Sequence, residues 1–254
     1  MPKNKKSLGQ NWLHDRDTLL EIAELTSGTS DTVLEIGPGL GTLTSALLKY
    51  FDQVIAVEFD ENLAANLLGS FPGKNLTVIH ADILDFNLDV LPKNYAVAGN
   101  IPYYITSPIV QKFLHADNPP SKVTLLVQKE VAERLAAGQG KYSILGLSAQ
   151  IYAEVSLGPV IKRDLFTPSP KVDSQVVILK PRPKPLATEQ TMALIKLGFS
   201  APRKKLTSNL SRTLQLPRER LRNIFNEINL PEQVRPASLS IDNWIKLETF
   251  LHKH

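Results

Sequence analysis

The sequence predicts an α/β fold in which a mostly parallel sheet is followed by a small all-α domain. Short β-branched runs alternate with amphipathic segments over residues 1–181, a pattern typical of parallel strands joined by crossover helices. A glycine turn at Gly37, Gly39 and Gly41 joins the first of these runs to the helix that follows. Residues 182–254, by contrast, show only helical patterns.

The strands are expected where Val, Ile and Leu cluster between turn residues, as in strands buried on both faces. They fall at residues 32–36, 54–58, 77–80, 95–99, 123–127 and 172–179. Helices are expected between them, where apolar residues recur every three to four positions. These fall at residues 43–49, 61–68, 107–115 and 130–137.

A basic, proline-rich stretch at residues 180–185 separates two parts of the chain. Its alternating prolines can continue neither a helix nor a strand. We therefore expect one domain over residues 1–181 and a second over residues 182–254. In the second domain, Pro217 and Pro231 punctuate helices that are expected at residues 189–197, 204–214, 219–228 and 241–251.

The composition excludes several classes of protein. With 254 residues and 43% hydrophobic content, the chain can bury one full core. It has no cysteine, which excludes disulfides and thiolate metal sites, and the spacing of its 5 histidines predicts no metal site. No apolar run approaches the roughly 20 residues that cross a bilayer, and none of signal-peptide length follows the basic N-terminus. We expect a soluble, cytoplasmic monomer.

The positive charge lies in the second domain. Residues 182–254 carry 13 Lys+Arg and 6 Asp+Glu, a net charge of +7, whereas residues 1–181 carry −3. A basic module beside a mildly acidic one suggests that one part binds a polyanion while the other does chemistry. Nucleic acid is therefore the expected partner, although basic tails also occur for solubility alone.

The ends of three successive strands carry residues suited to a nucleoside cofactor. Gly37, Gly39 and Gly41 let the backbone approach a ligand closely and aim amide groups at it. Glu58 ends the next strand, where a carboxylate can accept both ribose hydroxyls, and Asp82 follows the third strand, where it can bind an adenine amine. The glycine spacing departs from the dinucleotide fingerprint, which favours S-adenosylmethionine over a nicotinamide cofactor.

Asn100, Ile101, Pro102 and Tyr103 follow the fourth strand and suit a planar base that carries an exocyclic amine. The side-chain oxygen of Asn100 and the backbone carbonyl of Ile101 can accept hydrogen bonds from the amine, while Tyr103 stacks on the ring. Such bonds draw the amine nitrogen towards tetrahedral geometry, so that its lone pair faces a methyl donor. Because this amine is paired within helices, the base is expected to be unpaired or flipped out. These residues therefore predict methyl transfer to adenine.

Several segments resemble the ribosomal RNA adenine dimethyltransferases that act on small-subunit RNA. They are residues 6–13, 35–41, 100–103 with 105–108, and 166–174. The resemblance covers nearly the whole chain and implies a Rossmann-like class I methyltransferase core with a seven-stranded sheet. It also implies that two adjacent adenosines in the 3′-terminal hairpin loop of 16S-type RNA become dimethyladenosine, with S-adenosylmethionine converted to S-adenosylhomocysteine. The implied partner is the immature small ribosomal subunit, and the implied role is in its biogenesis.

The resemblance also assigns roles to residues. The positions that match cofactor-binding residues are Asn11, Leu13, Gly37, Glu58, Asp82 and Asn100, and residues 1–13 are expected to close over the cofactor. Asn100 and Tyr103 match the catalytic motif. Phe166 matches an aromatic residue expected on the opposite face of the target base, but a core phenylalanine before a proline turn is an equally good interpretation. Trp12 stands where the family usually has Phe, and either ring can pack against the cofactor.

The residues expected to face RNA are cations of the second domain and of the N-terminus. They are Arg203, Lys204, Lys205, Arg212, Arg218, Arg220 and Arg222, together with Lys5 and Lys6. Pro202 occupies a position in a basic motif where the family commonly has Arg. Contacts of this kind hold folded RNA by shape and charge more than by sequence.

Alternatives to a small-subunit RNA dimethyltransferase remain open. A related enzyme could modify large-subunit RNA and confer antibiotic resistance, although residues 107–108, residues 168–174 and the basic tail disfavour it. In a third hypothesis the chain is a ribosome-assembly factor whose binding matters more than its catalysis. A nicotinamide dehydrogenase is disfavoured because no catalytic signature of that class is present.

Overall fold

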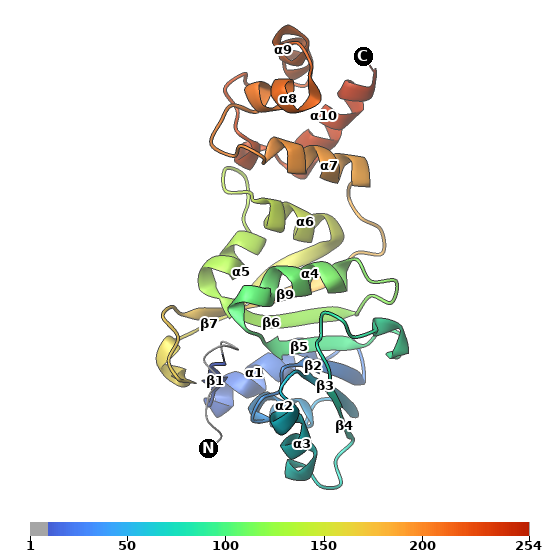
Figure 1. The fold of residues 1–254 in the computed structure, drawn as a ribbon, viewed down its shortest axis with the longest axis vertical. Coiled ribbons are helices and arrows are strands. Elements are labelled where there is room, and N and C mark those ends of the chain that lie inside the picture. Colours follow the sequence, from blue (N-terminus) through green and yellow to red (C-terminus); the bar gives the residue numbers. More distant parts are fainter. Residues whose placement is uncertain (1–9, 254) are drawn as a thin grey trace. The chain divides into compact units, whose positions relative to one another are not determined.

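The computed structural model describes residues 10–253, which fold into two compact units (Figure 1). One unit runs to Glu133 and resumes over Ala153–Pro181, and the other contains Arg134–Tyr152 and the chain from Arg182 onward. Lys5 and Lys6, which were predicted to contact RNA, lie outside the described residues. Within residues 10–253, no helix is both long enough and apolar enough to cross a membrane.

The first unit is built on a seven-stranded sheet with the strand order β4-β3-β2-β5-β6-β9-β7. The strands are β2 (Thr32–Ile36), β3 (Gln53–Glu58), β4 (Leu76–His80), β5 (Ala96–Asn100), β6 (Lys122–Gln128), β7 (Ala153–Ile161) and β9 (Ser174–Pro181). The strands from β4 to β6 pair in parallel, whereas β9 pairs antiparallel with both β6 and β7. The predicted mostly parallel, seven-stranded sheet is therefore confirmed.

The direction in which strands are added reverses between β2 and β5. From β2 the chain moves outward through β3 to β4, and from β5 it moves the other way to β6. Because crossovers between parallel strands are right-handed, the two sets of connecting helices fall on opposite faces of the sheet. The first set is α2 (Thr42–Leu47) and α3 (Glu61–Ser70); α4 (Thr106–Leu114) belongs to the second, and α5 (Lys129–Leu135) follows β6.

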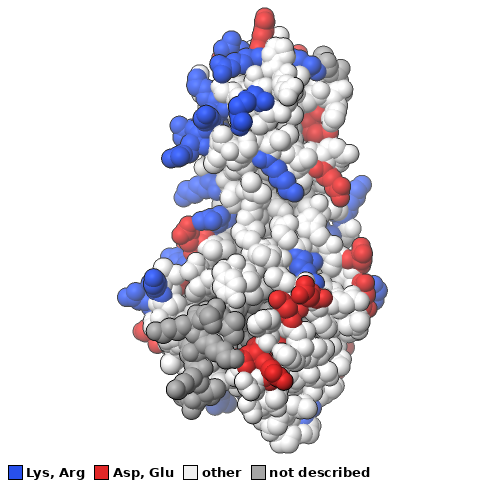
Figure 2. All heavy atoms as spheres, viewed as in Figure 1, with Lys and Arg blue, Asp and Glu red and all other residues white. Residues whose placement is uncertain are grey.

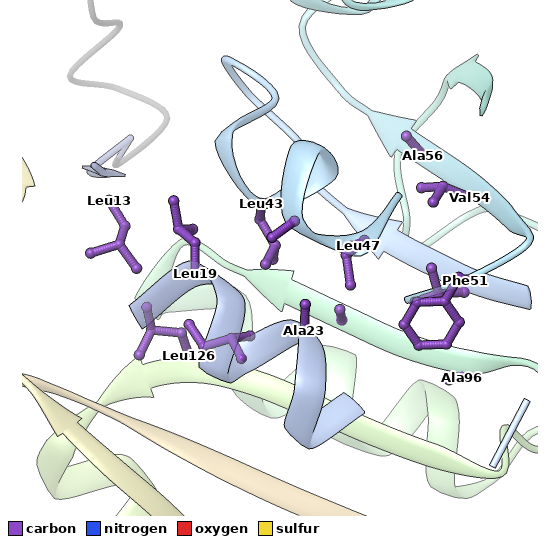
Figure 3. Packing of buried hydrophobic residues seen from close by; sticks show 14 of the residues in the cluster. Leu13, Leu19, Ala23, Leu43, Leu47, Phe51, Val54, Ala56, Ala96 and Leu126 are labelled. Carbon is purple, nitrogen blue, oxygen red and sulfur yellow. The ribbon is translucent and has the colours of Figure 1, made fainter. Parts of the chain in front are cut away.

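One face of the sheet is covered by α1 (Arg16–Thr26) and α2, whose buried residues meet side chains of β3, β5 and β6 (Figure 3). The backbone N–H of Thr18 donates to the Asp15 carboxylate at 2.9 Å, which caps the start of α1. Leu19, Ile22 and Ala23 then follow at helical spacing and are at most 6% exposed. This pattern gives the chain a helix before β2 that was not among the predicted elements.

A two-residue strand, β1 (Trp12–Leu13), pairs antiparallel with β8 (Phe166–Thr167). Leu13 and Phe166 lie opposite each other in this pair, are 1% and 3% exposed, and belong to the same hydrophobic core. Figure 3 labels Leu13 in this core. The N–H of His14 adds a hydrogen bond of 3.2 Å to the carbonyl of Leu165. These contacts anchor residues 10–13, which we call the N-terminal strap.

The second unit is helical. Its helices are α6 (Ile144–Tyr152), α7 (Glu189–Gly198), α8 (Leu206–Leu214), α9 (Arg218–Glu227) and α10 (Ile241–Lys253). Trp244 and Phe225 are fully buried in its core, and the rings of Trp244 and Phe199 lie 6.2 Å apart. Gly198 makes this packing possible, because a Cβ there would overlap the Trp244 ring.

The structure differs from the predicted domain boundary at residues 134–152. They were expected in the first domain, but they pack with the second unit because Leu147 and Ile151 of α6 are buried in the helical core. Strand β7 was not predicted either. A β-bulge between Leu157 and Val160 breaks its alternation, and the intervening Gly158-Pro159 reads as a turn.

Candidate active site and cofactor site

A cavity of about 310 Å³ lies at the carboxyl ends of β2, β3, β4 and β5, within the first unit. Its volume falls in the range of small-molecule sites. The predicted site residues that line it are Asn11, Gly37, Gly39, Glu58, Asp82, Asn100, Ile101, Pro102 and Tyr103. The reversal in strand order thus brings together residues from four strand ends and from the N-terminal strap.

Glu58 is held in one orientation at the end of β3. It is 5% exposed, and its Oε2 accepts a hydrogen bond of 3.0 Å from the N–H of Gly39. Its Oε1 accepts a second bond, of 2.9 Å, from the N–H of Asp60. Each carboxylate oxygen retains further acceptor capacity, so this fixed group can still receive the hydroxyls of a ribose.

The three glycines of the turn have different tasks. Gly37 and Gly39 line the cavity with φ angles of +61° and +56°. Their N–H groups are already used within the protein, by the carbonyl of Val57 and by Glu58. Gly41 does not line the cavity. A Cβ atom at this position would lie 2.7 Å from the Leu67 side chain, so the lack of a side chain allows α2 and α3 to pack closely.

Asn100 is oriented by the N-terminal strap. Its Nδ2 donates a hydrogen bond of 2.9 Å to the backbone carbonyl of Asn11. Only the NH2 of an asparagine can donate to a carbonyl, so this bond distinguishes the two ends of the amide. The oxygen of Asn100 is thereby left as the atom that can accept a hydrogen bond from a ligand.

Tyr103 is fixed by the sheet. Its hydroxyl forms a hydrogen bond of 2.8 Å with Oγ of Ser174, a fully buried residue at the start of β9. Burial raises the pKa of Tyr103, and the bond to Ser174 lowers it by less. The phenol is therefore neutral at physiological pH, and its ring is held at the cavity wall.

The cavity wall is acidic. Glu35, Glu58 and Asp82 line it, and none of its described lining residues is basic. Asp82 is held by a 2.8 Å hydrogen bond from the N–H of Leu84 to its Oδ1. Carboxyl groups favour a cation and disfavour the pyrophosphate of a dinucleotide. The site therefore fits S-adenosylmethionine, which carries a sulfonium and an ammonium group.

Glu35 belongs to the cavity lining, but its side chain is almost completely buried, at 1% exposed. Its Oε2 accepts a hydrogen bond of 2.6 Å from the hydroxyl of Thr44, whereas its Oε1 has no hydrogen-bond partner among residues 10–253. Burial raises the pKa of Glu35 to about 8; the negative charge of Glu58 adds to this shift, and the bond from Thr44 opposes it. Glu35 is thus largely a neutral acid at pH 7.

Two predicted site residues lie in the core instead of the cavity. Leu13 and Phe166 are not among the residues that line it. The interpretation of Phe166 as a core residue is therefore the one that its position favours. Its partner across the β1–β8 pair is Leu13, so both side chains anchor the N-terminal strap.

Two aromatic residues at the cavity were not predicted. Phe59 and Tyr104 both line it, and they are 58% and 66% exposed. Each directly follows a predicted site residue, Glu58 in one case and Tyr103 in the other. An aromatic residue immediately after a predicted site residue was thus the available signal. Groups of three or more potential metal ligands are absent from the part of the chain that the structure describes.

The predicted RNA-facing cations of the second unit lie at its surface. Figure 2 shows Lys and Arg side chains gathered over this unit. Arg203, Lys204 and Lys205 are exposed and lie in the turn before α8. The helix was expected to begin at Lys204, but it begins two residues later, at Leu206.

The cations on the two following helices are partly engaged within the protein. Arg222 forms a 2.8 Å ion pair with Glu232, and Arg212 donates to Asn209. Arg218 is exposed, whereas Arg220 is half-buried and its Nε has no hydrogen-bond partner in the part of the chain that the structure describes. The turn before α8 therefore presents three consecutive exposed positive charges.

Replacing Glu58 with alanine should weaken S-adenosylmethionine binding by ~1–3 kcal/mol, because ribose hydroxyls would lose a fixed acceptor. Isothermal titration calorimetry measures the change. Glu61→Ala removes an equal charge from an exposed position in the first turn of α3 and serves as the control. Equal affinities of the two variants would contradict the ribose assignment.

Glu35 should make the stability of the cofactor-free protein depend on pH. The folded pKa of about 8 exceeds the ordinary value of 4.5, so between these values the folded state keeps a proton that the unfolded chain has lost. Stability is therefore expected to fall as the pH rises from about 5 to about 8, by up to roughly 1.4 kcal/mol per pH unit. Urea unfolding at several pH values should show this slope, and Glu35→Gln should remove it. Parallel curves for the two proteins would refute the assignment.

Comparisons with known proteins agree with a cavity that binds S-adenosylmethionine. The family model described as "Ribosomal RNA adenine dimethylase" matches residues 1–253. The chain is 38% identical to the ribosomal RNA small subunit methyltransferase A of Acaryochloris marina, over 99% of this chain and 98% of that protein. It is 36% identical to the protein of the same name from Fusobacterium nucleatum, over 96% of both chains.

Two solved structures share the fold. The 23S rRNA methyltransferase ErmE superposes with a TM-score of 0.79 at 31% identity, covering 95% of this chain and 99% of that one. A dimethyladenosine transferase from Plasmodium falciparum superposes with a TM-score of 0.77 at 27% identity, covering 95% and 97%. The chain belongs to the ribosomal RNA adenine dimethylase family and is an S-adenosylmethionine-dependent methyltransferase.

Proposed function

We propose that this protein dimethylates the exocyclic amines of two adjacent adenosines in the 3′-terminal hairpin loop of small-subunit ribosomal RNA. The donor is S-adenosylmethionine, and the substrate is the RNA of an immature small subunit in the cytoplasm. The protein acts as a monomer. The observation that carries this proposal is the orientation of Asn100, whose amide oxygen is left to accept a hydrogen bond at the cavity.

The base seat works by orientation. The oxygen of Asn100 and the carbonyl of Ile101 accept hydrogen bonds from the adenine amine, and Tyr103 stacks on the ring. These neutral acceptors stabilise the positive charge that develops on the amine nitrogen as the N–CH3 bond forms. The methylated nitrogen then loses one proton to solvent water for each methyl group that it receives. A strong base is not required, because the bound cofactor supplies an already activated methyl group. Ser174 positions the Tyr103 ring through its hydroxyl.

The cofactor seat lies beside the base seat in the same cavity. Glu58 accepts the ribose hydroxyls, and Asp82 accepts the adenine amine of the cofactor. Gly37 and Gly39 allow the turn to pass close to the ligand, because a side chain at either position would occupy the strained positive-φ region. Asn11, in the N-terminal strap, covers the seat and holds Asn100 at the same time.

The second unit provides the surface for RNA. Arg203, Lys204 and Lys205 precede the N-terminus of α8, where cations are disfavoured by the helix dipole unless an anion neutralises them. A backbone phosphate supplies that anion. Lys5 and Lys6, together with Arg212, Arg218, Arg220 and Arg222, are proposed as further phosphate contacts.

A large-subunit RNA methyltransferase remains the second candidate, because ErmE shares the fold over 95% of this chain. The sequence relationship favours the small subunit: identity is 38% to the Acaryochloris marina protein and 31% to ErmE. We therefore propose the small-subunit RNA as the substrate.

Labelled S-adenosylmethionine distinguishes the two substrates. The protein is incubated with undermethylated small subunits and, separately, with naked large-subunit RNA, and mass spectrometry locates the modified bases. Dimethyladenosine is expected in pairs on the small-subunit RNA alone. Label found only on the large-subunit RNA would overturn the proposal.

The Asn100→Ala variant tests whether this side chain contributes to catalysis. Loss of an oriented acceptor should lower kcat by about 100-fold or more. Asn66→Ala removes an exposed amide of α3 and should leave the rate unchanged. If Asn100→Ala fully restored subunit maturation in cells lacking the protein, binding to the subunit would be the dominant role.

Replacing Arg203, Lys204 and Lys205 together with alanine should reduce the salt dependence of RNA binding. The slope of log affinity against log salt is expected to change by roughly one for each lost phosphate contact. Fluorescence anisotropy over a salt series measures it, with Lys246→Ala, an exposed cation of α10, as the control. An unaltered slope would remove this turn from the RNA interface.

A further inference from the structure

Two consecutive tyrosines at the cavity have opposite environments. Tyr103 is half-buried and bonded to Ser174, whereas Tyr104 is 66% exposed. They begin the 3-10 helix η3 (Tyr103–Ile105), in which successive side chains point about 120° apart. The same backbone turn therefore directs one ring inward and presents the other at the mouth of the cavity.

Because Tyr104 is exposed, its ring is not needed to pack the protein core. Among the exposed large hydrophobic residues that the structure describes, only Phe59 and Tyr104 line this cavity. Phe59 directly follows Glu58 and lies on the side proposed for the cofactor. Tyr104 instead directly follows Tyr103 of the proposed base seat, and it both lines the cavity and is exposed to solvent.

Insertion of one base into the cavity disrupts the stacking of the base next to it. The flipped base leaves its neighbour without a stacking partner, at a cost that the protein must offset. That neighbour stays within one nucleotide of the cavity mouth, because the RNA backbone links the two. The Cα atoms of Tyr103 and Tyr104 are about 3.8 Å apart, so a ring next to the occupied seat is within reach of the neighbouring base.

We propose that Tyr104 is a stacking platform for the base adjacent to the target adenine. This inference rests on the proposed function and deepens it, because the substrate contains two adjacent adenosines. Stacking on an aromatic ring tolerates any base, since every base has a π-face. Tyr104 can therefore support the neighbour before and after that neighbour is methylated, and so assists both rounds of modification.

A thermodynamic cycle tests the pairing of Tyr104 with the neighbouring base. Small subunits are reconstituted with RNA whose 3′-terminal hairpin is synthetic and carries the target adenosine beside either adenosine or an abasic ribose. For the wild type, kcat/KM at the target should fall about 5- to 150-fold when the neighbouring base is absent. Tyr104→Ala should show a similar loss on the intact RNA and no additional loss on the abasic RNA.

Two further variants separate stacking from folding. Tyr104→Phe retains the ring and should behave as the wild type does. Tyr50→Ala removes an exposed tyrosine that does not line the cavity, and should leave both rates unchanged. A Tyr104→Ala variant that is fully active, or one whose loss multiplies with that of the abasic RNA, would overturn the inference.

The outcome for the wild type alone tests the underlying substrate assignment. If the wild type methylates the intact RNA but the cycle is multiplicative, only the role of Tyr104 is refuted. If the wild type methylates neither RNA, the proposed function fails, and the inference fails with it.

Discussion

The reversal of strand order between β2 and β5 is the constraint on which the rest of the structure depends. Right-handed crossovers place the helices of the two halves on opposite faces of the sheet, and a crevice remains at the carboxyl ends of the strands between them. Glu58, Asp82 and Asn100 come from different strands, yet all three reach this crevice. The strand order of the sheet, and not a local sequence motif, therefore brings these three side chains together.

The N-terminal strap connects the two halves of the cavity. It is anchored by the buried side chains of Leu13 and Phe166 and by backbone hydrogen bonds of the β1–β8 pair, while the carbonyl of Asn11 accepts a hydrogen bond from Asn100. A single hydrogen bond thus sets the orientation of the proposed catalytic amide. The position of the strap and the orientation of the amide are therefore linked through this bond.

Charge divides the work between the two units. The cavity wall carries the carboxylates of Glu58 and Asp82, which favour a cationic cofactor and would repel phosphate. A neutral base can enter such a cavity while its backbone stays outside. In the proposed function, the exposed cations of the turn before α8 supply the attraction for RNA that the cavity lacks. The unequal distribution of charge along the sequence reflects this arrangement.

The candidate site was only partly visible in the sequence. The Gly37 turn, Glu58, Asp82 and Asn100 could be predicted, because each follows a recognisable strand and parallel strands end at a common edge. The bond between Asn11 and Asn100 could not, since the two residues are 89 positions apart and only the fold brings them together. The same holds for the Ser174 partner of Tyr103 and for the burial that raises the pKa of Glu35.

By itself, the sequence determined the alternation of strands and helices, the basic second unit and most of the residues at the strand ends, because these follow from local patterns of apolar and charged residues. Tertiary structure alone decided that Phe166 and Leu13 are core residues, that Gly41 serves packing and that residues 134–152 join the second unit. These outcomes depend on which distant side chains meet, and a phenylalanine or a glycine has the same local signature whether it contacts a ligand or the core.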